Sequence, residues 1–167
     1  MWKEERRMRI TLVVVGKIKE KFFVMAVEEY RKRLSRYCKV EIVEVADEKT
    51  PDGASLAEER QIKEREGDRI LRVIQRENIY VIVLAIEGEK MDSVQFSKKI
   101  EGLGVRGHSH IVFVIGGSLG LDRRVLECAD ERISFSDLTF PHQLMRVILL
   151  EQIYRAFRIA YHEPYHK

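Results

Sequence analysis

Residues 109–120 have the sequence Ser-His-Ile-Val-Phe-Val-Ile-Gly-Gly-Ser-Leu-Gly, an apolar stretch that ends in a glycine-rich turn. A short apolar run bounded by glycine is typical of a strand that is buried on both faces of a sheet. The same pattern predicts apolar strands at Arg9–Val15 and Tyr80–Ile86. An alternating pattern predicts a short strand at Val40–Val45, and a last strand is expected at Arg132–Phe135. We therefore expect one sheet with an apolar centre.

Helical periodicity lies between these strands. Apolar residues recur at helical spacing in Lys19–Arg36, Ser93–Leu103 and Gln143–Tyr161, and Ser55 with Glu58 can form a capping box at the start of a further helix. A short helix is expected after the glycine-rich turn. Strands that alternate with helices are typical of an α/β fold, so we predict a mostly parallel sheet with helices on both faces.

The composition is that of a folded soluble protein, with 45% hydrophobic and 34% charged residues among 167. We predict a single domain over residues 1–167; Met8 is a second candidate start, which would make the residues before it an extension. The apolar stretches are too short to cross a bilayer, and no apolar signal segment follows the charged start. We therefore expect a cytoplasmic protein without membrane contact.

Basic residues are concentrated between positions 17 and 39. The segment 30–37, Tyr-Arg-Lys-Arg-Leu-Ser-Arg-Tyr, places cations beside two tyrosines. That combination suits RNA binding by phosphate contact and base stacking. A solvated helix end explains the same residues equally well, because cations favour a helix C-terminus. The composition leaves both interpretations open.

Three predicted loops follow strands and therefore lie at the carboxyl edge of the sheet: residues 87–90, 116–120 and 136–141. Ligands bind at this edge in open parallel α/β sheets. The glycines of 116–120 would let a ligand approach the backbone closely. The turn matches neither the dinucleotide-binding pattern nor the P-loop, however, and a plain strand-to-helix turn has the same signature.

The predicted helix Gln143–Tyr161 is apolar around most of its circumference. One narrow arc holds its polar residues Glu151, Gln152, Arg155 and Arg158. A helix that covers a sheet needs only one apolar stripe, so a second surface must cover the rest. A second copy of the chain is the simplest cover, and deep burial within the monomer is the alternative. Arg146 lies in the apolar arc and therefore needs a partner or a ligand.

The tail His162-Glu163-Pro164-Tyr165-His166 matches the zinc-protease string H-E-x-x-H. That motif works only on a continuous helix, which Pro164 would interrupt. Lys167 follows directly, so the sequence beyond the string supplies no third ligand. We predict no metal site. Disorder would be the plain expectation for a tail, but the aromatic, histidine and lysine side chains favour a functional one.

Four segments, in order, resemble a known family. They are 115–121 (Ile-Gly-Gly-Ser-Leu-Gly-Leu), 135–146 (Phe-Ser-Asp-Leu-Thr-Phe-Pro-His-Gln-Leu-Met-Arg), 151–157 (Glu-Gln-Ile-Tyr-Arg-Ala-Phe) and 164–167 (Pro-Tyr-His-Lys). These segments are similar to the ribosomal RNA large-subunit methyltransferase H family of the SPOUT class. The resemblance runs from about Met8 to Lys167. It implies a SPOUT-type fold with a C-terminal trefoil knot, which no periodicity would have revealed.

The resemblance implies a homodimer that transfers a methyl group from S-adenosylmethionine to N3 of a pseudouridine in 23S ribosomal RNA, free or within the ribosome. The cofactor site that it implies consists of Leu84, Gly116, Phe135, Ser136, Asp137, Leu138, Thr139 and Phe140. Ala85 and the pair Ser118-Leu119 depart from the family pattern. These departures concern loop detail more than the activity.

The resemblance also implies catalytic roles for Arg155, Tyr165 and His166. The sulfonium of the cofactor already activates the methyl group, so the enzyme mainly aligns the displacement. N3 of pseudouridine carries a proton at neutral pH. His166 is a candidate base for that proton, and Arg155 or Arg146 is a candidate to stabilise the anion. The sequence does not choose among them.

Two other functions fit part of the sequence. A non-catalytic RNA-binding protein would use the basic stretch 17–39 and would need no cofactor cavity. A SPOUT enzyme that acts on transfer RNA would share the cofactor but not the substrate. Cofactor binding separates the first alternative from an enzyme, and a comparison of RNA substrates separates the second.

Overall fold

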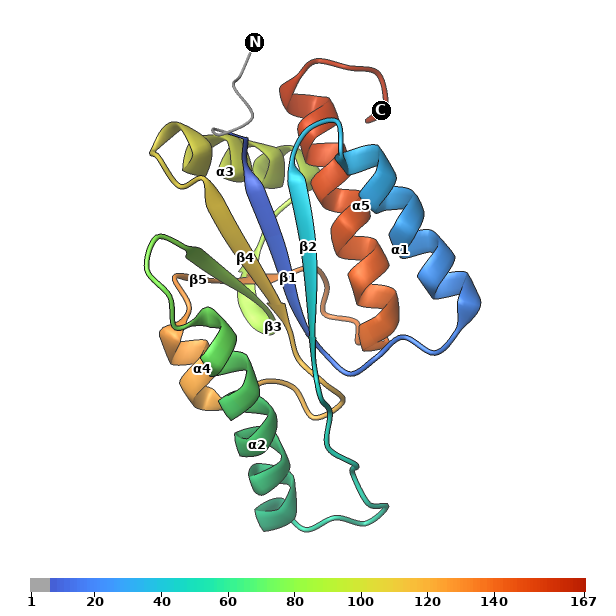
Figure 1. The fold of residues 1–167 in the computed structure, drawn as a ribbon, viewed down its shortest axis with the longest axis vertical. Helices are drawn as coiled ribbons and strands as arrows, with labels where there is room; N and C mark the ends of the chain where they lie inside the picture. Colours follow the sequence, from blue (N-terminus) through green and yellow to red (C-terminus); the bar gives the residue numbers. More distant parts are fainter. Residues whose placement is uncertain (1–6) are drawn as a thin grey trace.

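The computed structural model describes residues 7–167, so the predicted extension before Met8 lies outside the described residues except for Arg7. These residues form a five-stranded sheet in the order β2-β1-β4-β3-β5 (Figure 1). The strands are β1 (Arg9–Val15), β2 (Lys39–Val45), β3 (Tyr80–Lys90), β4 (His110–Ile115) and β5 (Glu131–Ser134). Each pair of neighbouring strands is parallel.

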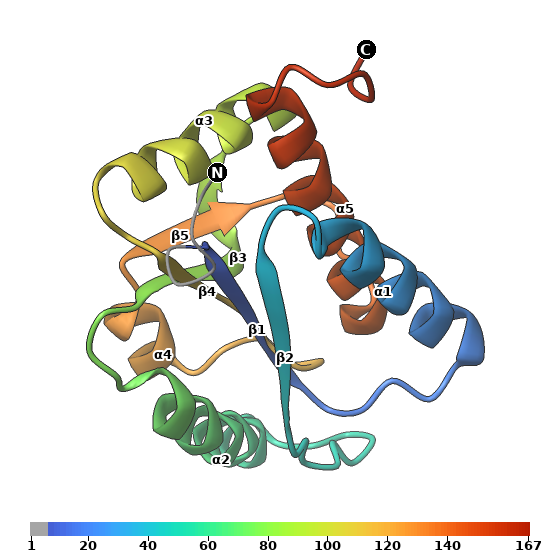
Figure 2. The ribbon, with the colours of Figure 1, turned by 45° about the horizontal axis from the view of Figure 1, so that its top comes forward.

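Helices cover both faces of the sheet (Figure 2). On one face lie α1 (Lys21–Leu34), α3 (Ser93–Val105) and α5 (His142–Ala160), and on the other lie α2 (Leu56–Ile74) and α4 (Arg123–Cys128). The predicted α/β fold is therefore confirmed. The capping box at α2 is also present, because Ser55 Oγ accepts the backbone N–H of Glu58 at 3.2 Å.

The central strands are apolar throughout because both of their faces are buried. In β1, Ile10, Leu12 and Val14 belong to the core beneath α1, α3 and α5. Val13 and Val15 point the other way, into the core beneath α2 and α4. Alternation of side chains along a strand thus divides one apolar run between two cores.

The predicted loop at residues 87–90 is wrong, since β3 continues through this segment. Ile133 of β5 pairs with Leu84 and again with Glu89, so the residues between these two positions leave the ladder as an arch. A Cβ at Gly88 would lie 2.6 Å from the backbone of Ile133. Only glycine permits this approach. The charged residues around Gly88 are exposed, which is why their pattern is that of a loop.

Helix α5 packs against both α1 and α3 within one chain. Its residues Leu149, Leu150 and Ile153 have no exposed surface. Much of the apolar surface for which a second copy was expected is therefore covered inside the monomer. The homodimer and the trefoil knot stay predictions. Within residues 7–167, no helix is both long enough and apolar enough to span a membrane.

Arg146 has the partners that its position in the apolar arc requires. Its guanidinium donates to the carbonyl oxygens of Val15 and Gly16 at 3.0 and 2.8 Å, and to Glu44 Oε2 at 3.0 Å. The side chain is 1% exposed, and burial lowers the pKa of Arg146 while Glu44 opposes that shift. Because these donors are engaged inside the fold, Arg146 is not free to stabilise an anion on a substrate.

Candidate active site

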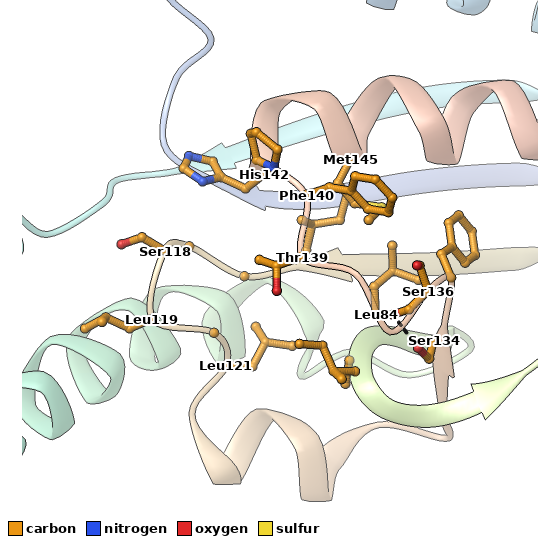
Figure 3. Close-up of a pocket in the computed structure, with 18 of the residues that line it drawn as sticks. Leu84, Ser118, Leu119, Leu121, Ser134, Ser136, Thr139, Phe140, His142 and Met145 are labelled. Carbon is orange, nitrogen blue, oxygen red and sulfur yellow. Dashed lines mark hydrogen bonds between the residues drawn. The ribbon is translucent and has the colours of Figure 1, made fainter.

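A cavity of about 880 Å³ opens at the carboxyl edge of the sheet. Its walls come from the first residues of the arch, from the turn 116–121 after β4, and from the segment 134–142 that joins β5 to α5 (Figure 3). Small-molecule sites commonly measure about 300–1,000 Å³. The cavity therefore lies at the carboxyl edge of the sheet, where the sequence predicted that a ligand binds.

Most of the expected cofactor residues line this cavity: Leu84, Gly116, Phe135, Ser136, Leu138, Thr139 and Phe140. Asp137 is the exception. Its carboxylate lies 2.5 Å from Lys90 Nζ at the surface, where its side chain is 75% exposed. That ion pair joins the end of β3 to the wall segment, so Asp137 contributes to the shape of the site rather than to its lining.

Hydrogen bonds within the wall segment fix its conformation. Ser136 Oγ accepts the backbone N–H of Leu138 at 2.9 Å, and Ser134 Oγ donates to the carbonyl oxygen of Ser136 at 3.2 Å. Such local side-chain bonds replace the backbone pairing that the chain loses when it leaves a strand. The wall after β5 is thus preorganised by its own serines.

The sequence analysis expected glycine at position 116 to let a ligand approach the backbone, but the structure shows that the turn itself leaves no room for a side chain. A Cβ at this position would lie 3.0 Å from the carbonyl carbon of Gly120 and 3.0 Å from the Leu121 side chain. The turn folds back on itself, with a bridge between Gly117 and Gly120, the latter at φ +86°. A side chain at Gly116 would therefore deform the turn before it met any ligand.

Several lining residues were missed by the sequence analysis. They include Lys63, Leu121, Leu126, His142 and Met145. Leu121, His142 and Met145 lie within the segments that resemble the family but were given no role. Lys63 and Leu126 belong to helices and lie outside those segments. Ala85, Ser118 and Leu119, the departures from the family pattern, also line the cavity.

The three expected catalytic residues meet around Glu151 of α5. Glu151 Oε1 accepts from Arg155 Nε at 3.0 Å, from Arg155 Nη2 at 2.6 Å and from the Tyr165 hydroxyl at 3.0 Å. Arg155 Nη1 lies 3.2 Å from His166 Nδ1. The structure thus brings Arg155, Tyr165 and His166 together and adds Glu151, whose spacing of four residues from Arg155 was the available signal.

The chemistry of this cluster is that of hydrogen-bond donors. Burial and the neighbouring Glu151 raise the pKa of Tyr165 to about 12, so its hydroxyl keeps its proton at neutral pH. A guanidinium can only donate, so His166 Nδ1 must accept from Arg155, and the neutral imidazole then carries its hydrogen on Nε2. In this arrangement His166 does not offer a free basic nitrogen.

A separate set of contacts anchors the tail. Arg158 forms an ion pair with Glu163 and donates to the carbonyl oxygen of Pro164 at 2.7 Å. The Tyr37 hydroxyl donates to Glu163 Oε2 at 2.9 Å. Helix α5 ends at Ala160, so the H-E-x-x-H string is not helical. Across residues 7–167, no three His, Cys, Asp or Glu side chains are grouped as metal ligands.

The basic segment 30–37 only partly matches the proposed RNA surface. Tyr37 is 9% exposed and stacks on Phe157 at 5.5 Å between ring centroids, so it is a core residue and not a platform for a base. Arg36 remains 70% exposed. The three arginines of this segment form ion pairs with Glu28, Glu29 and Glu163, and Lys32 is exposed. Stacking of a base on Tyr37 is excluded.

The cavity lies at the start of α5, and the cluster of Glu151, Arg155, Tyr165 and His166, here called the tail cluster, lies toward its end. Met145 lines the cavity near the start of the helix, and Arg155 lies ten residues further along it. That separation corresponds to about 15 Å along a helix axis. Within one chain, the expected catalytic residues therefore do not reach the expected cofactor residues.

A parallel α/β sheet with a nucleoside-sized cavity at its carboxyl edge defines a class of enzymes that bind a nucleotide-like cofactor beyond their strand ends. The family model described as "Predicted SPOUT methyltransferase" matches residues 8–166. The chain belongs to the SPOUT methyltransferase family.

Curated relatives match over nearly the whole chain. The protein named ribosomal RNA large subunit methyltransferase H 1 of Clostridium perfringens is 59% identical over 160 residues, which cover 96% of this chain and 100% of the relative. Ribosomal RNA large subunit methyltransferase H of Bifidobacterium adolescentis is 61% identical with the same coverage.

Solved structures share the fold. A probable methylase family protein from Haemophilus influenzae Rd KW20 superimposes with a TM-score of 0.53 at 11% identity, covering 96% of this chain and 70% of that chain. The tRNA (m1G37) methyltransferase from Aquifex aeolicus gives a TM-score of 0.52 at 15% identity, with 89% and 69% covered. At these identities the likeness concerns architecture alone.

Proposed function

We propose that this protein transfers a methyl group from S-adenosylmethionine to N3 of a pseudouridine in 23S ribosomal RNA. The observation that carries the proposal is the identity of 59% and 61% to relatives named ribosomal RNA large subunit methyltransferase H, over their whole length. We infer that residues 8–167 act as one catalytic domain in the cytoplasm, where bacterial ribosomes are assembled.

The cavity fits the cofactor in size and in chemistry. Apolar side chains such as Leu84, Leu121 and Phe135 form surfaces against which an adenine can pack, and the glycine-rich turn exposes backbone groups for hydrogen bonds. When bound, S-adenosylmethionine supplies a methyl group that its sulfonium makes electrophilic. The walls would hold that methyl group in line with the attacking nitrogen and exclude water.

The tail cluster suits the target base. Loss of the N3 proton to water leaves negative charge on the imide of pseudouridine, and Arg155 with the Nε2–H of His166 can donate hydrogen bonds to it. His166 would act as the base only after its Nδ1 leaves Arg155. We therefore favour anion stabilisation as the main role of this cluster. The Tyr165 hydroxyl donates its one hydrogen to Glu151, so it would become a further donor only after that bond breaks.

We also propose that the enzyme works as a homodimer. The tail cluster lies about 15 Å from the cavity along α5 of its own chain, so a complete site requires the tail of a second copy. The Ile86 and Leu138 side chains at the cavity are 56% and 70% exposed, although both are large and apolar. A second subunit would cover such side chains.

The test is methyl transfer from radiolabelled S-adenosylmethionine onto ribosomes, free 23S ribosomal RNA and transfer RNA, all from cells that lack the modification. We expect label in 23S ribosomal RNA, and none in a 23S transcript made in vitro, because that transcript contains uridine and no pseudouridine. Label in transfer RNA alone would favour a SPOUT enzyme that acts on transfer RNA. Failure to bind the cofactor in calorimetry would favour the non-catalytic RNA-binding protein.

A further inference from the structure

Lys63 is the one lysine or arginine that lines the cavity within residues 7–167. It belongs to α2, is half-buried, and lies outside the segments in which the cofactor residues were expected. His142 also lines the cavity, but burial lowers the pKa of its imidazole, and Arg146 lowers it further. At neutral pH the cavity therefore has a single fixed positive charge.

Close packing fixes α2 against the glycine-rich turn. A Cβ on Gly117 would lie 3.1 Å from Glu66 Oε1, so the two segments touch. Glu66 is itself 5% exposed, and its other oxygen accepts the backbone N–H of Glu48 at 3.0 Å. Lys63 lies one helical turn before Glu66, on the same face of α2. The contact between Glu66 and Gly117 therefore holds Lys63 at the cavity.

The Lys63 ammonium has no carboxylate partner in the described part of the chain. Asp122 lies near enough for Lys63 to favour its ionised form, but its Oδ2 pairs with Arg124 Nη2 at 3.0 Å. Glu87 lines the same cavity and pairs with no cation among residues 7–167. A half-buried ammonium at a cavity wall favours a ligand that brings an anionic group to it.

We propose that Lys63 binds the α-carboxylate of the amino-acid part of S-adenosylmethionine; this rests on the proposed function. Figure 3 shows Ser118 and Leu119 at the end of the cavity nearest α2, and Leu84 at the opposite end. The apolar end suits the adenine. The end beside α2 suits the charged amino-acid part, whose carboxylate is the cofactor's one anionic group. Lys63 thus positions the cofactor along the cavity.

The experiment compares two ligands that differ only in the amino-acid part. S-adenosylhomocysteine carries the carboxylate, and 5′-methylthioadenosine lacks the whole amino-acid part. Calorimetry would measure both with the wild type, Lys63→Met, Lys63→Arg and the control Arg65→Met, which changes an exposed cation of the same helix. We expect Lys63→Met to weaken S-adenosylhomocysteine about tenfold or more and to leave 5′-methylthioadenosine unchanged. Lys63→Arg should restore much of the loss.

Three results would overturn the proposal. Equal weakening of both ligands would mean that Lys63 supports the fold of the cavity. Unchanged affinity for both, with a raised KM for RNA, would make Lys63 a phosphate contact. Unchanged affinity with an unchanged KM would leave it without a ligand. If the wild type binds neither ligand, the proposed function itself fails, and that result is distinguishable because it appears before any variant is compared.

Discussion

Arg146 joins three elements at the point where the cavity begins. The guanidinium binds the carbonyl oxygens at the end of β1 and the carboxylate of Glu44 on β2, while its backbone belongs to the second turn of α5. His142 and Met145, which line the cavity, lie within one helical turn of it. A buried cation therefore sets the position of the helix that carries one wall of the site.

Replacing Arg146 should destabilise the fold measurably. Arg146→Met leaves the Val15 and Gly16 carbonyl oxygens without these donors, which should cost on the order of 2 kcal/mol in the free energy of unfolding. The free energy of unfolding of Arg146→Lys should lie between those of Arg146→Met and the wild type, because an ammonium cannot reproduce the planar fork of the guanidinium. Urea denaturation measures the difference. The control Arg123→Met alters a cation that is 89% exposed and should have no effect. Equal stability of Arg146→Met and the wild type would contradict this account.

At the level of elements, the sequence predicts what depends on local periodicity. The strand Arg9–Val15 is found with the predicted bounds, and the capping box of Ser55 and Glu58 begins α2 as expected. These features depend on neighbours within a few residues. The arch in β3 depends instead on β5, more than 40 residues away, which pairs with it on both sides of Gly88. No pattern within residues 80–90 could reveal that pairing.

The residues of the candidate site were likewise predicted where they form a local motif and missed where they do not. The glycine-rich turn and the segment 135–140 were found because they are contiguous and resemble family motifs. Lys63 was missed because it enters the cavity from a helix whose pattern is that of an ordinary amphipathic surface. Glu151 was assigned only to a polar arc, although it accepts hydrogen bonds from Arg155 and Tyr165. Tertiary packing decides the role of Lys63 and brings Tyr165 to Glu151, whereas the spacing of Glu151 and Arg155 on one helix was a local signal.

The tail is an element whose removal should separate binding from catalysis. Deleting Pro164–Lys167 removes Tyr165 and His166 but keeps the ion pair of Arg158 with Glu163, which anchors the end of α5. We expect loss of methyl transfer with cofactor affinity nearly unchanged, because the tail does not line the cavity of its own chain. Single-turnover methylation and cofactor titration, with Tyr165→Phe as the milder variant, would measure the two properties.

Two outcomes would count against that role of the tail. Normal turnover by the truncated chain would show that Tyr165 and His166 are dispensable. Loss of cofactor affinity would make the tail part of the cofactor site. Tyr165 also packs edge-on against Tyr154 at 4.9 Å between ring centroids, so thermal unfolding of the truncated protein should be recorded as a check on α5.

On the scale of the whole molecule, the proposed cofactor cavity and the proposed catalytic cluster lie apart within one chain. The cavity lies at the start of α5, and the hydrogen-bond donors of the tail cluster lie toward its end. Phe22 and Met25 on α1 are 65% and 71% exposed, although large apolar side chains are seldom left in water together. A two-fold arrangement of two copies would bury such residues and bring each tail to the other copy's cavity.

Subunit complementation tests this arrangement directly. Gly116→Val should disable the cavity, because the added side chain collides with the turn at Gly120 and Leu121. His166→Ala should disable the tail. Each variant alone should be nearly inactive. After the two are unfolded and refolded together, random pairing puts about half of the subunits into mixed dimers, each with one complete site of two. About a quarter of wild-type methyl transfer should then return. If each site were built within one chain, no mixture would recover activity, and light scattering that finds a stable monomer at micromolar concentration would exclude the dimer itself.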